Sequence, residues 1–156
     1  MVMDFQLHDY YMREALKLAR RAADADEVPV GAVIVHGRDI IARAHNQVEV
    51  LKDPTAHAEM IAITQAADYL GSKWLHECVM YVTIEPCCMC SGALVLSRLG
   101  KVFYGAADPK TGACGSVVDI VRNKALNHQI EVLGGLLQDE CSIMISDFFK
   151  KKRKRV

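Results

Sequence analysis

Hydrophobic residues near the start of the chain recur at the spacing of an amphipathic helix. Over residues 8–25 the apolar stripe consists of Tyr11, Ala15, Leu18, Ala19 and Ala22, a helical period that predicts a helix. The next segment, 31–36, is almost wholly apolar, as expected for a strand buried on both faces. A polar turn at 37–39 then leads to a second strand over 40–44, which completes a predicted hairpin.

The rest of the chain alternates between strand-like and helix-like segments. Further strands are predicted over 79–84, 101–106 and 130–133, and further helices over 54–70, 87–97 and 136–152. We expect a loop over 47–52, and a short helix near 118–122 is compatible with the pattern. This order predicts an α/β fold, a three-layer α/β/α arrangement with a five-stranded mixed sheet. The hairpin should be antiparallel and the later strand–helix–strand crossover parallel.

Two prolines mark the expected starts of helices that carry polar side chains. Proline suits the first helical position, because its missing N–H would be unpaired there anyway. Asp53 and Pro54 therefore predict one helix start, with His57 and Glu59 in its first turns, and Pro86 predicts another. Each helix N-terminus contributes partial positive charge, which favours anionic groups such as thiolates.

Length and composition fit one domain over 1–156. Of its 156 residues, 51% are hydrophobic, which is ample for a core. No stretch is apolar and long enough to span a membrane, and residues 1–6 lack the pattern of a signal peptide. We therefore expect a cytoplasmic protein, in which the six cysteines are free or metal-bound.

Positive charge is concentrated at the C-terminal end, although the formal net charge is zero. Residues 150–155 are six consecutive Lys or Arg, and without them 13 basic residues face 19 acidic ones. We interpret 150–156 as a basic tail. Such a run is often a solvated end, and it also occurs in nuclear localisation signals. The negative charge of the remaining chain favours a third interpretation, a contact with an RNA backbone.

The strongest chemical signal is a P-C-x-x-C motif at 86–90, preceded by an H-x-E motif. Cys87 and Cys90 are three residues apart, so at a helix start both sulfurs lie on one face. His57 is the natural third ligand. Zinc with three protein ligands keeps one position open for water, which is the pattern of catalytic sites.

Glu59 fits a proton carrier better than a fourth ligand. It stands two residues from His57, and residues two apart on a helix do not face each other. Zinc lowers the pKa of its water towards roughly 7; Glu59 can take that proton and later protonate a departing amine. H-x-E followed by P-C-x-x-C is the signature of zinc nucleobase deaminases, so the motifs predict hydrolytic deamination.

Simpler interpretations exist for each half of the pattern. A lone C-x-x-C is often a redox pair or half of a structural zinc site. A structural zinc module that binds nucleic acid needs a fourth ligand, for which Cys88 or Cys114 are candidates. A deaminase of a free base or nucleoside, such as guanine or cytosine, shares the zinc motif. The joint pattern, in this order, favours catalytic zinc.

Nearly the whole chain resembles the bacterial tRNA-specific adenosine deaminases, within the cytidine deaminase-like zinc superfamily. The segments that carry the resemblance are 27–33, Asn46, 53–59, 81–90, 105–115 and 147–149. The last two, which contain D-P-K-T-G at 108–112 and D-F-F at 147–149, are more specific to the tRNA enzymes than the zinc motif is. The resemblance implies conversion of adenosine to inosine at the wobble position of a tRNA anticodon.

The same resemblance implies one zinc ion per subunit and a homodimer whose subunits both contact the anticodon stem-loop. By position, His57, Cys87 and Cys90 are implied as zinc ligands and Glu59 as the proton shuttle.

Four further residues are implied as substrate contacts. Asn46 would hydrogen-bond the flipped-out adenosine, Asp108 and Lys110 would contact neighbouring loop nucleotides, and Phe149 would help line the pocket. A base in a single-stranded loop costs less to extrude than a paired one. The D-P-K-T-G loop and the basic tail favour RNA over a free base.

Overall fold

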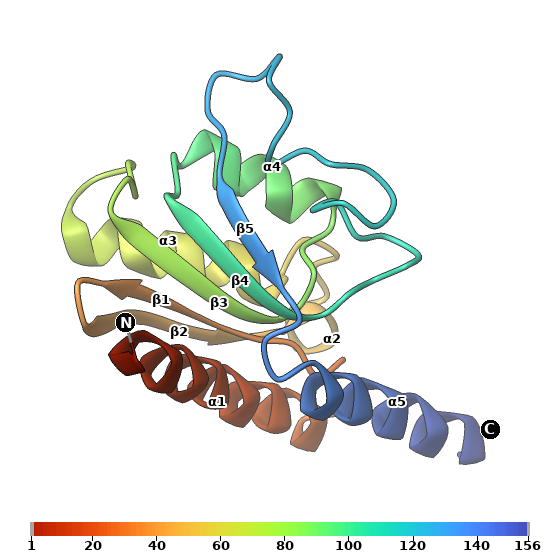
Figure 1. Ribbon diagram of the computed structural model, residues 1–156. Coiled ribbons are helices and arrows are strands. Elements are labelled where there is room, and N and C mark those ends of the chain that lie inside the picture. Colours follow the sequence, from red (N-terminus) through yellow and green to blue (C-terminus); the bar gives the residue numbers. More distant parts are fainter. Residues whose placement is uncertain (1, 156) are drawn as a thin grey trace.

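A five-stranded mixed sheet lies at the centre of the molecule, with the strand order β2-β1-β3-β4-β5 (Figure 1). The structure, a computed structural model, describes residues 2–155, with side chains from Phe5 to Arg155. The strands are β1 (Gly31–His36), β2 (Asp39–His45), β3 (Cys78–Ile84), β4 (Lys101–Ala106) and β5 (Glu131–Gly134). The helices are α1 (Val2–Asp24), α2 (Val48–Leu51), α3 (Ala58–Leu70), α4 (Cys88–Leu96) and α5 (Gln138–Lys154).

The strand directions agree with the sequence prediction. β1 pairs antiparallel with β2, with which it forms the hairpin, and also with β3. β3 and β4 are parallel, as are β4 and β5. Parallel neighbours need a crossover connection, and α4 supplies it between β3 and β4.

Helices cover both faces of the sheet, which confirms the three-layer architecture. α1 and α5 lie on one face, and α3 and α4 on the other (Figure 1). Side chains alternate across a strand, and β1 shows the consequence: Ala32 and Ile34 join the core under α3 and α4, whereas Val33 and Val35 face α1. Burial on both faces explains why residues 31–35 are apolar, whereas His36 at the end of the strand is only partly buried.

The start of α3 differs from the prediction. The helix begins at Ala58 rather than near Pro54. Asp53 caps no helix, because its Oδ1 accepts hydrogen bonds from the backbone N–H and the hydroxyl of Thr55, at 2.8 and 2.7 Å. Asp favours such local turns as strongly as helix caps, so its presence alone did not locate the helix start. His57, in an extended conformation, is the residue that precedes the helix.

Two shorter segments also differ. Residues 47–52, predicted as a loop, contain the short helix α2. Residues 118–122 form no helix; Asp119 instead makes an isolated β-bridge with Cys114. β-branched residues fill much of this segment and disfavour helix.

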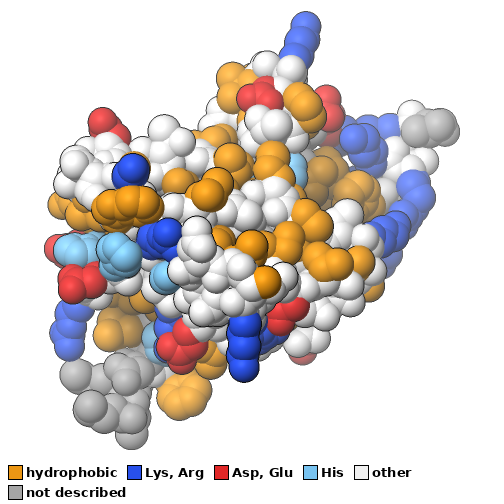
Figure 2. Space-filling view, turned by 90° about the horizontal axis from the view of Figure 1, so that it is seen from above, with side chains coloured by type: hydrophobic (Ala, Val, Ile, Leu, Met, Phe, Trp, Pro, Cys, Tyr) orange, Lys and Arg blue, Asp and Glu red, His pale blue; other side chains and the backbone are white. Residues whose placement is uncertain are grey.

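The C-terminal basic residues belong to a helix. α5 continues through Lys154, so its last turn consists of basic side chains. Lys and Arg side chains gather at this end of the molecule in the space-filling view (Figure 2). Positive charge there stabilises the helix through its dipole. Over residues 2–155, each helix is too short or too polar to span a membrane.

Candidate active site

Three side chains that can bind a metal converge where α3 and α4 begin. Nδ1 of His57 lies 3.7 Å from Sγ of Cys87 and 3.5 Å from Sγ of Cys90. All three ligand atoms lie within 4.8 Å of one another. A tetrahedral zinc ion with bonds of about 2.0–2.3 Å would separate nitrogen and sulfur ligands by about 3.6 Å. The observed spacing therefore fits this ion.

Among the described side chains, no fourth His, Cys or carboxylate completes the group. Cys88 is exposed, and Cys114 is buried with its Sγ 3.6 Å from the hydroxyl of Ser91. Neither of the two candidate fourth ligands therefore closes the site. A set of three leaves one coordination position open, which suits catalysis rather than a structural role.

Two of the three candidate ligands stand directly before helices. His57 precedes α3 and Cys87 precedes α4, each with an extended backbone. The pKa of Cys87 is lowered to about 4, chiefly because it accepts a hydrogen bond from the Cys90 thiol, with His57 adding to the effect against burial. The pKa of Cys90 is raised, because its proton is held by Cys87 and its sulfur is buried. A thiolate, the form that binds metal, is thus present at neutral pH.

Glu59 lies buried beside the ligand group, on the first turn of α3. Burial raises the pKa of its carboxyl group above the ordinary value of 4.5. A carboxyl group with a raised pKa is suited to both accepting and donating protons.

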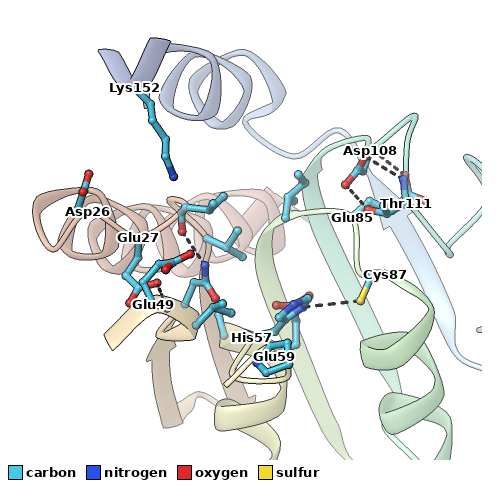
Figure 3. Close-up of a pocket in the computed structure, with 17 residues that line it drawn as sticks. Asp26, Glu27, Glu49, His57, Glu59, Glu85, Cys87, Asp108, Thr111 and Lys152 are labelled. Atoms are coloured by element: carbon cyan, nitrogen blue, oxygen red, sulfur yellow. Dashed lines mark hydrogen bonds between the residues drawn. The ribbon is translucent and has the colours of Figure 1, made fainter. Parts of the chain in front are cut away.

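A cavity of about 340 Å³ opens over these residues (Figure 3). Its size is within the range of small-molecule sites, and it lies at the carboxyl end of β3, where open α/β sheets bind ligands. Its wall consists of Asp26, Glu27, Val28, Val30, Asn46, Val48, Glu49, Pro54, His57, Ala58, Glu59, Ile84, Glu85, Cys87, Asp108, Thr111 and Lys152.

Asn46, directly after β2, brings a buried amide to this wall. Its Nδ2 donates a hydrogen bond of 3.4 Å to the carbonyl oxygen of Val28. Its Oδ1 is buried and has no hydrogen-bond partner among the described residues. An unpaired buried acceptor is costly, and Asn46 borders the cavity, so this oxygen is a candidate acceptor for a ligand donor.

Asp108 reaches the cavity from the loop that follows β4. Its Oδ1 accepts hydrogen bonds from the backbone N–H groups of Lys110 and Thr111, at 2.9 and 3.1 Å, and its Oδ2 accepts one of 2.7 Å from the Thr111 hydroxyl. Burial alone would raise the pKa of Asp108, but these hydrogen bonds outweigh it and lower the pKa below 3.8. The side chain of Lys110 is exposed and lies outside the cavity wall.

Phe149 does not line the cavity, contrary to the expectation from sequence. Its side chain is 38% exposed and packs edge-on against Phe148. Lys152 reaches the cavity from the same helix instead (Figure 3). Phe148 and Lys152 are four residues apart and share one helix face, as the 5.7 Å from Nζ to the ring shows. Phe149 is rotated by about 100° from that face.

Two buried glutamates that support the cavity wall were missed by sequence reasoning. Glu27 accepts hydrogen bonds of 2.9 and 2.8 Å from the backbone N–H groups of Glu49 and Val50, and so holds α2. Glu85 binds the loop that carries Asp108. In the sequence, each of these glutamates is a single charged residue beside an apolar segment. That pattern does not show which backbone groups the carboxylate will bind.

The fold and the site are those of a deaminase, and residues 6–153 match the MafB19-like deaminase family. The chain is 50% identical over 148 residues to the tRNA-specific adenosine deaminase of Aquifex aeolicus (strain VF5), which covers 95% of this chain and 97% of that protein. It is 48% identical over 147 residues to that of Bacillus subtilis (strain 168), with 94% and 91% covered.

A solved structure from studies of A-to-I editing by tRNA:A34 deaminases superposes with a TM-score of 0.83 at 41% identity, covering 86% of this chain and 98% of that one. The chain therefore belongs to the tRNA-specific adenosine deaminase family, with the cytidine deaminase-like fold that the resemblance implied.

Proposed function

We propose that this protein converts adenosine to inosine at the wobble position of a tRNA anticodon. The observation that carries the proposal is the group of three candidate ligands with Glu59 at a cavity of about 340 Å³. Two relatives with 48–50% sequence identity are named tRNA-specific adenosine deaminase, and the similar solved structure comes from work on tRNA:A34 deaminases at the wobble position. The reaction consumes water and releases ammonia.

We assign the metal as zinc, one ion per subunit, held by His57, Cys87 and Cys90. Two sulfurs and an imidazole nitrogen are a donor set that suits zinc, and the nitrogen–sulfur distances support it. When bound, zinc supplies an acidified water as the nucleophile.

Glu59 moves the protons of the reaction. Its carboxylate takes a proton from the attacking water and delivers it to a ring nitrogen of the adenine. It then takes the second proton from the hydroxyl group on the attacked carbon and passes it to the amino group, which leaves the ring as ammonia while the carbonyl group of inosine forms. Burial beside the ligand group supports this role, because it excludes competing water and raises the pKa of the carboxyl group.

Asn46 and Asp108, which both line the cavity, bind the nucleotide. The unpaired Oδ1 of Asn46 accepts a hydrogen bond from a donor of the nucleoside, either its amino group or a ribose hydroxyl. The Asp108 carboxylate accepts one from a ribose 2′-hydroxyl, the group that distinguishes RNA from DNA. Lys110, exposed beside it, contacts the phosphates of neighbouring nucleotides.

The basic end of α5 contacts the backbone of the anticodon arm. Its cations neutralise phosphates that the otherwise acidic chain would repel. Lys152 connects this surface with the cavity, because it lines the cavity and lies on the same helix.

A homodimer completes the proposal. The face seen in Figure 2 carries hydrophobic side chains in contact with solvent. Large exposed hydrophobic residues include Leu96 on α4, which is 78% exposed, together with Val117, Val118, Leu126 and Leu133. Exposed apolar surface of this kind marks protein interfaces, and symmetric dimers are the most common oligomers.

The test is incubation of the protein with an anticodon stem-loop that carries adenosine at the wobble position, followed by nucleoside analysis. We expect inosine from this RNA and no ammonia from free adenosine, guanine or cytidine. Ammonia from a free base or nucleoside, with an unchanged stem-loop, would contradict the proposal and identify a deaminase of small molecules.

A further inference from the structure

We propose that Glu85 is a positioning residue for the substrate: its carboxylate holds the loop 108–116 in the form that turns Asp108 towards the cavity. The inference rests on the proposed function, because it concerns how the same site recognises RNA.

The carboxylate of Glu85 collects four hydrogen bonds from this loop. The backbone N–H groups of Asp108, Cys114 and Ser116 donate to it at 3.1, 3.0 and 3.1 Å. The hydroxyl of Ser116 also donates to it. Glu85 as a whole is 2% exposed, so the loop folds around one buried anion much as an N-terminal helix turn folds around a capping group.

These four bonds leave Glu85 with no free capacity for a substrate. Oε1 accepts from Asp108 and from the Ser116 hydroxyl, and Oε2 accepts from the N–H groups of Cys114 and Ser116. A carboxylate has about four acceptor positions. Glu85 borders the cavity, yet it acts through the loop and not on the base.

Gly112 shows how closely the loop surrounds the carboxylate. A Cβ atom at this position would lie 2.4 Å from the carboxyl carbon of Glu85 and 2.5 Å from the carbonyl oxygen of Asp108. Only a residue without a side chain allows this approach. Position 112 must therefore be glycine for the loop to pack against the Glu85 carboxylate in this way.

A further hydrogen bond connects the loop 108–116 with the segment that carries the candidate metal ligand Cys87. Pro86 follows Glu85, and its carbonyl oxygen accepts a hydrogen bond of 2.8 Å from the N–H of Ala113. Cys87 comes next and precedes α4. One short segment thus places a metal ligand and, through Glu85, the Asp108 peptide whose own side chain faces the cavity (Figure 3).

The first test measures the loop without reference to activity. In Glu85→Gln one acceptor oxygen becomes an amide that faces N–H donors. We expect hydrogen exchange at the amides of residues 108, 114 and 116 to accelerate by about tenfold or more, with exchange in the sheet unchanged. Unchanged exchange at these amides would overturn the inference whatever the protein's activity.

The second test measures recognition. For an RNA stem-loop we expect Glu85→Gln to raise KM about tenfold, to change kcat by less than about threefold and to leave zinc content unchanged. Gly112→Ala, which keeps the carboxylate but displaces the loop, should raise KM in the same way. A fall in kcat with unchanged KM in both variants would overturn the inference.

A double-mutant cycle tests whether Glu85 acts through Asp108. Residues that act as a unit are non-additive. Asp108→Asn should therefore add little to the KM of Glu85→Gln, and independent, multiplicative effects would contradict the inference. Leu75→Ala, a core change at the opposite end of β3, controls for lost stability and should leave KM unchanged. If wild-type protein makes no inosine although the exchange result holds, the proposed function fails and the anchoring of the loop by Glu85 stands.

Discussion

Nδ1 of His57 lies 3.5 Å from Sγ of Cys90, although 33 residues separate them along the chain. His57 directly precedes α3, and Cys90 lies in the first turn of α4. The two helices are attached to different strands, so the sheet sets the distance between the two atoms. The separation matches that expected for a nitrogen and a sulfur ligand of one zinc ion.

Replacing His57, Cys87 or Cys90 by Ala should strongly reduce zinc content, because each removes one of three ligands. Metal analysis of the purified variants checks this. Cys88→Ala is the matched control: it removes an exposed thiol from the same helix and should keep a full equivalent of zinc. Full zinc content in any of the three ligand variants would show that residue to be wrongly assigned.

Glu59→Gln should keep zinc and lose turnover. The amide is nearly isosteric with the carboxyl group but cannot carry a proton, so we expect kcat to fall by about 10²–10⁴-fold. Metal analysis and single-turnover assays on an anticodon stem-loop separate the two effects. Loss of the metal from this variant would mean that Glu59 is itself a ligand.

Asn46→Ala should damage activity more than stability. Oδ1 has no partner among the described residues, and the 3.4 Å bond from Nδ2 ends on the carbonyl oxygen of Val28, which also accepts from the N–H of Val30 at 2.8 Å. Removal of the amide should therefore change the free energy of unfolding by only about 1 kcal/mol. We expect kcat/KM to fall by about tenfold or more, since the proposed function makes this oxygen an acceptor for the nucleoside. Asn123→Ala provides a control, because Asn123 is an exposed turn residue. Unchanged kcat/KM in Asn46→Ala would refute the contact.

Asp108→Asn should weaken the preference for RNA over DNA stem-loops. The pKa of Asp108 is lowered from 3.8, so its carboxylate stays ionised from pH 5 upwards. The ratio of wild-type to variant affinity should therefore be flat between about pH 5 and pH 8. The stability that these hydrogen bonds give the ionised group is present above 3.8 and is lost as the pH falls through the lowered pKa.

Binding of RNA and DNA stem-loops of one sequence measures this preference. Asp119→Asn, in the same region but outside the cavity wall, should keep the preference of the wild type. An RNA preference in Asp108→Asn equal to that of the wild type would leave Asp108 a purely structural turn residue.

Deleting residues 150–156 should weaken tRNA binding and flatten its salt dependence. Each lost phosphate contact lowers the slope by about one unit on duplex and by less on single strands. Phe149 stays in place, and turnover of bound substrate should change little, because the role proposed for these residues is to position the RNA. Equal affinity and slope for truncated and full-length protein would indicate a solvated end.

Two single substitutions, Lys152→Gln and Lys150→Gln, separate a contribution at the cavity from the general effect of positive charge on α5. Both are exposed lysines of α5, but Lys152 lines the cavity. We expect Lys152→Gln to raise KM more than Lys150→Gln does. Lys124→Gln, which removes an exposed charge outside the cavity wall, should change neither KM nor the salt slope.

Local pattern was sufficient for the sheet and the metal-binding motif. The apolar run 31–36 became β1, and Lys101–Ala106 became β4 with the predicted bounds. The spacing of Cys87 and Cys90 placed both sulfurs on one helical turn, and His57 joined them. These features follow from the periodicity of apolar side chains and from the number and spacing of the candidate ligands. Both can be read directly from the sequence.

Tertiary contacts decided the remaining features. Asp53 accepts hydrogen bonds from Thr55 instead of capping a helix, and α3 begins only at Ala58. Lys152, rather than Phe149, lines the cavity, because it lies on the face of α5 that carries the buried Phe148. Glu85 is a charge next to a proline in sequence; only the folded loop supplies the four donors that make burial of this charge tolerable.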